Sequence, residues 1–131
     1  MEIKSVEEIL KCAGIGLPTL NVLVPNVDNY STLLMQPHGD IEVDDQGVRS
    51  FDRILATTQF SQFLSNAVEA QADLVITPEY AMPWDVLLGA IQDGVKPSRG
   101  KLWVLGCESI KLSELETVKT EMSPYATVIY E

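Results

Sequence analysis

The chain has 131 residues, which is enough for one domain with a hydrophobic core. Hydrophobic residues make up 46% of it and charged residues 21%, a globular composition that excludes a disordered chain. The net charge of −10 argues against nucleic acid and anionic membrane surfaces as partners, because no basic patch is available to meet phosphates.

The first predicted elements are a short helix and a strand. Ser5 can cap a helix over residues 5–13, since its side chain can accept a hydrogen bond from the first turn. Two glycines and a proline then end this helix. The apolar run at residues 20–24 predicts the first strand. We therefore expect residues 1–19 to be a lead-in and residues 20–131 to form the main unit.

A hairpin insertion is predicted at about residues 31–51. The segment Asp40-Ile41-Glu42-Val43 alternates polar and apolar residues, and Asp44-Asp45-Gln46-Gly47 is rich in turn formers. These acidic residues do not follow a calcium-binding loop, because Asp45 stands where that loop needs glycine. We expect a solvated hairpin without a metal. His38 is the only histidine and is predicted to be a loop residue.

Residues 52–71 are predicted to form a helix that packs on a sheet. One apolar stripe repeats there at steps of three and four and consists of Ala56, Phe60, Phe63, Ala67 and Ala70. Polar residues occupy the positions away from the stripe. A stripe of this kind can also bind a partner, but packing on a sheet is the use that we expect.

Glu79 is the candidate catalytic residue. It follows the continuous apolar run Leu74-Val75-Ile76, which predicts a strand that is covered on both faces. Pro78 removes a backbone donor and ends that strand, so Glu79 is expected at the carboxyl end, where α/β folds bind ligands. Between Pro78 and Pro83 its carboxyl would lie in a stiff, partly apolar setting that suits proton transfer. The alternative is a solvated loop glutamate.

Three further elements and a last strand complete the predicted order. Residues 83–94 are predicted to form a helix with proline at its first position. Residues 102–105 form the next buried strand, residues 112–121 a weak helix, and residues 125–130 the last strand. This alternation predicts an α/β fold with a largely parallel or mixed sheet and flanking helices.

The cysteines and the absence of export signals bear on the compartment. Cys12 and Cys107 have neither the spacing of a disulfide framework nor a partner at zinc-ligand spacing, which fits a reducing compartment. No apolar stretch is long enough to span a bilayer, and no signal peptide is evident. We expect a cytoplasmic protein with no membrane association and no cofactor.

Two blocks of the chain resemble the carbon–nitrogen hydrolase (nitrilase) superfamily. They are Ala72-Asp73-Leu74-Val75-Ile76-Thr77-Pro78-Glu79-Tyr80 and, after a helix, Gly100-Lys101-Leu102-Trp103-Val104-Leu105-Gly106. The family has a strand, a long helix, a strand that ends in apolar-Pro-Glu, a helix, a strand that ends in glycine, and a fourth aliphatic strand. Residues 126–130 match the fourth strand. The resemblance spans about residues 20–131 and implies an α-β-β-α sandwich.

The resemblance implies a Glu-Lys-Cys triad, in which Glu79 matches the general base. The base takes the proton of a cysteine thiol, and the thiolate attacks the carbon of a nitrile or an amide. The lysine stabilises the tetrahedral intermediate. A thioester acyl-enzyme then passes to water or another acceptor. The implied substrate is a small amide or nitrile.

The lysine and the cysteine of the triad have no match in this chain. The family lysine follows the fourth strand, whereas the chain stops at Glu131 and Lys111 and Lys119 precede that strand. Cys107 follows the third strand, and its use as a nucleophile beside Glu108 is a separate alternative. We therefore expect the N-terminal part of a hydrolase, inactive alone. The other alternative is a non-catalytic binding or regulatory module, completed by a partner chain on an uncovered sheet face.

Overall fold

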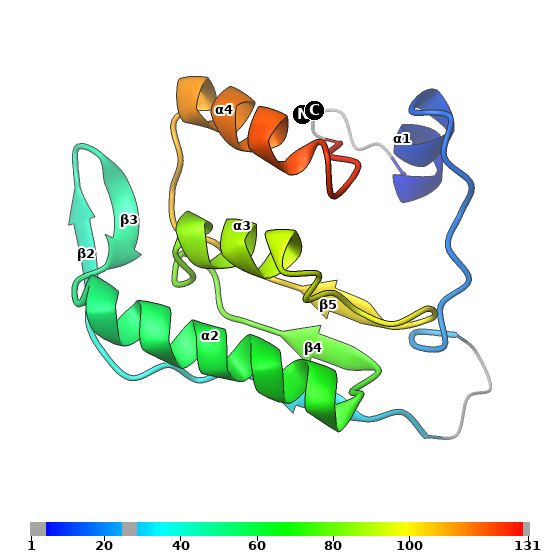
Figure 1. Cartoon of the computed structure of the whole chain (residues 1–131), viewed down its shortest axis with the longest axis horizontal. Coiled ribbons are helices and arrows are strands. Elements are labelled where there is room, and N and C mark those ends of the chain that lie inside the picture. The colour runs from blue at the N-terminus through cyan, green and yellow to red at the C-terminus, as the bar shows by residue number, and fades with distance from the viewer. Residues whose placement is uncertain (1–4, 25–28, 130–131) are drawn as a thin grey trace.

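The computed structural model describes residues 5–24 and 29–129. The elements follow in the order α1 (Val6–Cys12), β1 (Thr32–Leu34), β2 (Ile41–Asp44), β3 (Gly47–Ser50), α2 (Arg53–Ala70), β4 (Leu74–Ile76), α3 (Trp84–Gln92), β5 (Leu102–Val104) and α4 (Leu112–Met122). Strands β1, β4 and β5 form a parallel sheet with β4 in the middle, while β2 and β3 form an antiparallel hairpin (Figure 1). The predicted α/β class is confirmed.

The first strand of the sheet lies later in the chain than predicted. Residues 20–24 form no strand, because Leu23 adopts a left-handed φ of 62° that interrupts an extended backbone. The neighbour of β4 is instead Thr32–Leu34, which the sequence had placed inside the hairpin insertion. The prediction of a hairpin insertion at 31–51 is therefore wrong for the first part of this range. The hairpin itself is confirmed at Ile41–Ser50.

The register of the sheet gives it one covered face and a second face that is exposed only in part. Leu33, Val75 and Trp103 are aligned in one row and belong to the core beneath α2 and α3, which lie side by side in Figure 1. Side chains alternate along a strand, so the next row faces the other way. That row contains Leu34, Ile76 and Val104, of which Leu34 is 66% exposed and Val104 48% exposed. We call these three residues the open face.

Helix α2 supplies most of the core on the covered face. Four members of the predicted stripe are buried, namely Ala56, Phe60, Phe63 and Ala67. Ala70, the fifth member, is exposed, since no residue of α2 after Ala67 is buried, and Leu64 is buried beside the stripe. The Asp52 side chain accepts a hydrogen bond from Leu55 N at 2.9 Å and caps the helix.

The last predicted strand is not formed in the part of the chain that the structure describes. Residues 126–129 are irregular, and Tyr130, which was predicted to end the strand, lies outside the described residues. Tyr125 N and Ala126 N both donate to Met122 O at 2.9 Å, which turns the chain at the end of α4 instead of extending it.

No described helix combines the length and apolar character that crossing a bilayer requires.

Asp73 connects the beginnings of all three parallel strands. Its carboxylate accepts from Ser31 N and Ser31 Oγ, both at 2.9 Å, and from Lys101 Nζ at 3.1 Å. Ser31 directly precedes β1 and Lys101 directly precedes β5. The hydrogen bond from Ser31 N, followed by that from Lys101, lowers the pKa of Asp73 to about 2. The ionised carboxylate therefore stabilises the folded sheet.

Replacing Asp73 by asparagine is expected to destabilise the fold in a pH-dependent way. The folded-state pKa of Asp73 is below the value of about 3.9 found in unfolded chains, so its contribution is fully present above about pH 4. The contribution is lost as the pH falls toward about 2. Urea unfolding of both proteins between about pH 7 and pH 3 should show a difference that shrinks with acidification. Asp45→Asn, in the exposed hairpin turn, is the control. A difference that stays constant over this range would contradict the role of the ionised carboxylate.

Candidate functional site

Glu79 lies in a turn between β4 and α3. We call residues 78–81 the elbow. On one side of the elbow, Thr77 N donates to a backbone oxygen of β5 at 3.0 Å, and on the other, Met82 N donates to Gly106 O at 3.2 Å. The chain thus leaves the parallel pairing for a few residues and then returns to it. Glu79 lies at the carboxyl end of β4, where the sequence predicted it. The residue is exposed, which matches the alternative of a solvated loop glutamate and not the partly apolar setting that was expected.

Two backbone features shape the elbow. Tyr80 has a φ of 57°, a left-handed conformation that residues other than glycine seldom adopt. Gly106 has no room for a side chain, because a Cβ there would lie 2.7 Å from both Glu79 Cα and the carbonyl carbon of Pro78. Gly106 N also donates to the buried Thr77 Oγ1 at 2.8 Å. The glycine that ends β5 therefore lets the elbow pack directly on the sheet.

Glu79 lines a cavity of about 200 Å³ together with the loop that precedes the hairpin. His38 and Asp40 of this loop lie on the same cavity, as does Asp52 at the start of α2. Gln59 of α2 fixes the loop, because its side-chain oxygen accepts from His38 N at 2.9 Å and its side-chain nitrogen donates to His38 O at 3.1 Å. His38 is a loop residue as predicted, and the fold brings it to the same cavity as Glu79.

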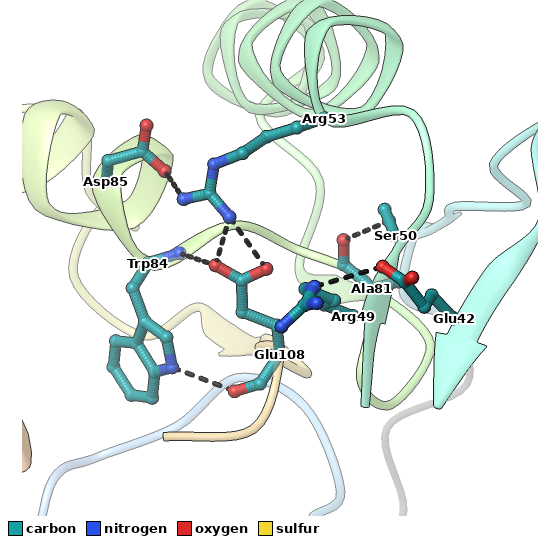
Figure 2. Close-up of polar contacts among 8 residues, drawn as sticks. All are labelled: Glu42, Arg49, Ser50, Arg53, Ala81, Trp84, Asp85 and Glu108. Atoms are coloured by element: carbon teal, nitrogen blue, oxygen red, sulfur yellow. Dashed lines mark hydrogen bonds and ion pairs between the residues drawn. The ribbon is translucent and has the colours of Figure 1, made fainter. Parts of the chain in front are cut away.

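The buried carboxylate of Glu108 lies a few residues after β5, close to the first residues of α2 and α3. Arg53 Nη1 donates to the two carboxylate oxygens of Glu108 at 2.7 and 3.0 Å, and Arg53 Nη2 donates to Asp85 Oδ1 at 2.8 Å (Figure 2). The hydrogen bond to Glu108 raises the pKa of Arg53 above its usual value. We call Arg53, Trp84, Asp85 and Glu108 the ion-pair cluster. The sequence did not indicate it, because Arg53 and Glu108 are 55 residues apart.

The hairpin is attached to both the elbow and the end of β5. Ser50 Oγ donates to Ala81 O at 3.0 Å (Figure 2). Ser109 N donates to Val48 O at 2.8 Å, and Val48 N donates to Ser109 Oγ at 2.9 Å. Of these contacts, the bond from Ser50 to Ala81 joins two residues that line the cavity. In residues 5–24 and 29–129 there is no group of three or more histidine, cysteine or acidic side chains that could hold a metal ion.

Cys107 has the chemistry of a structural thiol. It is partly buried, and its pKa is raised to about 12, first by burial and then by the neighbouring Glu108 carboxylate. The thiolate is the nucleophilic form of cysteine, so at neutral pH almost all of this side chain is unreactive. These properties argue against Cys107 as a nucleophile.

The structure brings only some of the candidate residues together. Glu79 and His38 share a cavity whose lining, among the described residues, includes neither a lysine nor a cysteine. Comparison of this chain with protein-family models, curated proteins and solved structures finds no match.

Proposed function

We propose that this chain supplies the general base, Glu79, to a carbon–nitrogen hydrolase site that cleaves amide or nitrile C–N bonds. The observation that carries the proposal is the position of Glu79 at the carboxyl end of the central parallel strand, beside a cavity of about 200 Å³. Ligands of open α/β sheets bind at this end of the strands. An exposed carboxylate on a cavity can reach the proton of a group bound there.

The proposal includes an α-β-β-α sandwich in which a second sheet packs on the open face. Helices α2 and α3 cover one side of the sheet, while the other side presents Leu34, Ile76 and Val104 in register. A row of apolar side chains that is partly exposed is typical of a surface that another layer covers. In the proposed protein, further residues or a partner chain supply that layer.

The proposed reaction begins with proton transfer to Glu79 from a cysteine thiol. The thiolate attacks the carbonyl carbon of the amide, a lysine stabilises the tetrahedral intermediate, and the C–N bond breaks as the proton passes to the leaving nitrogen. Water then hydrolyses the thioester and releases the acid. The cavity lining among the described residues has no lysine or cysteine. The proposal therefore assigns the catalytic lysine and cysteine to residues outside the described part of the chain.

Replacing Glu79 by glutamine tests the proposal. In the complete gene product, the variant is expected to lower kcat/KM by about 100- to 10,000-fold, which is the usual contribution of a general base. Thermal unfolding should change little, because the Glu79 side chain is exposed. The measurement is ammonia release from a panel of primary amides and nitriles. Glu69→Gln, at an exposed position of α2, is the matched control. Wild-type turnover in the Glu79 variant would refute the assigned role.

A second candidate function is a non-catalytic module that a partner chain completes through the open face. The combination of an exposed apolar row with a cavity lining that has no lysine or cysteine among the described residues favours it. This function predicts a stable association and no thiol-dependent hydrolysis. Size-exclusion chromatography, together with a dye that binds apolar surface, tests whether the chain associates through the open face. A folded monomer that binds no dye would count against the module.

A further inference from the structure

The backbone of Glu108 binds the residues that directly follow the elbow. Glu108 N donates to Met82 O at 2.9 Å, and Trp84 Nε1 donates to Glu108 O at 2.8 Å. Met82 is fully buried, so the first of these bonds is shielded from water. The elbow begins at Pro78 and ends just before Met82. The residue that directly follows the elbow is therefore hydrogen-bonded to Glu108.

The side chain of Glu108 connects the start of α3, which follows the elbow, to the start of α2. Its carboxylate accepts from Arg53, the first residue of α2, and also from Trp84 N at 3.4 Å (Figure 2). The neighbours of Arg53 along the chain include Ser50, which donates to Ala81 O in the elbow, and Asp52, which lines the cavity. One carboxylate thus joins the start of α3, just after the elbow, to the start of α2, just after Asp52.

The burial of Glu108 makes its pairing with Arg53 specific. The Glu108 side chain is 9% exposed, whereas the Arg53 side chain is 51% exposed. A buried carboxylate needs its cationic partner, because removing one member leaves the other without compensation. Arg53 meets this need with two bonds to Glu108 and uses its other terminal nitrogen for Asp85. A planar guanidinium compensates the charge of the carboxylate and also restricts its position.

We propose that Glu108 is a positioning residue, which together with Arg53 sets the location of the Glu79 carboxyl relative to the cavity. The inference rests on the proposed function of Glu79, and it goes further by assigning a role to a residue that does not itself line the cavity. Displacement of a reacting group by about 1 Å can lower a rate about 100-fold, so the loss of this anchor is expected to affect kcat more than KM.

The test combines a spectroscopic measurement with a kinetic one. Backbone amide resonances of residues 79–81 and the indole N–H resonance of Trp84 are compared between the wild type and Glu108→Gln. Both sets of resonances are expected to shift, and kcat of the complete gene product is expected to fall by about 10- to 100-fold with little change in KM. Glu42→Gln removes a partly buried Glu–Arg pair in the hairpin and is the matched control, in which residues 79–81 should not shift.

Arg53→Gln and Arg53→Lys keep the test decisive if Glu108→Gln does not fold. Arg53 is half exposed, and the lysine variant retains the charge without the planar donors. The elbow resonances should therefore shift more with glutamine than with lysine. If they stay unchanged while only thermal stability falls, the pair is merely structural and the inference is wrong, whatever the activity. If they shift but the wild type releases no ammonia, the anchoring of the elbow stands and the proposed hydrolase function fails.

Discussion

Replacing Phe60 by alanine is expected to lower the free energy of unfolding by about 3–5 kcal/mol, the usual cost of deleting a buried aromatic ring. Phe60 has no exposed surface and belongs to the same core cluster as Val75 and Met82, which are also fully buried. The ring lies where α2 meets the sheet, so its loss leaves a cavity that backbone elements on both sides would have to close. Urea unfolding measures the change as a lower midpoint at an unchanged slope.

Phe51→Ala is the matched control for this prediction. Phe51 is 70% exposed and directly precedes Asp52, the residue that caps α2, so the same chemical deletion is made outside the core. Exposed substitutions of this kind usually change stability by about 0.5 kcal/mol or less. Equal losses in the two variants would mean that Phe60 does not occupy the core in solution.

Elements with strong local signals were predicted within a few residues. The apolar stripe of α2 repeats at helical spacing, and the run Leu74-Val75-Ile76 is punctuated by Pro78. The helix after Pro83 and the strand at 102–104 are marked in the same way by proline and glycine. In each case the residues that determine the element are next to it in the sequence. For the same reason the position of Glu79 at the carboxyl end of the strand was predictable from the sequence, whereas its exposure was not expected.

The first strand was misplaced because two apolar runs compete for one position beside β4. Residues 20–24 and residues 32–35 both read as short strands, and local propensity does not separate them. The choice depends on a contact over a long distance in the sequence, namely the hydrogen bonds of Ser31 with Asp73 that bring β1 to the start of β4. Such pairing is a tertiary property, which a single sequence does not display.

The dependence on contacts between distant residues also explains which features of the site the sequence did not predict. The approach of His38 to Glu79 depends on Gln59, and the ion-pair cluster depends on Arg53 and Glu108, which lie on different elements. Nothing in the spacing of these residues marks them as neighbours. The resemblance implied a glycine at the end of the third strand, but only the packing of the elbow shows why glycine is needed there.

Replacing Gly106 by alanine is expected to displace the elbow and to destabilise the fold by about 1–3 kcal/mol, the usual cost of forcing an extra group into a packed site. The added Cβ would lie 2.7 Å from Glu79 Cα, and the atom that it meets is backbone rather than the end of a flexible side chain. The elbow backbone must therefore move, and it carries the proposed base with it. Urea unfolding measures the loss of stability, and the amide resonances of residues 79–81 report the displacement.

Gly89→Ala is the control that separates this steric effect from the general effect of replacing a glycine. Gly89 lies inside α3, and a Cβ at this position meets no atom within 4 Å. Because alanine favours a helix more than glycine does, this variant is expected to gain about 0.5–1 kcal/mol. The two substitutions add the same methyl group and should change stability in opposite directions. A Gly106 variant that is as stable as the wild type, with unshifted resonances in the elbow, would show that the close approach of β5 to Glu79 does not exist in solution.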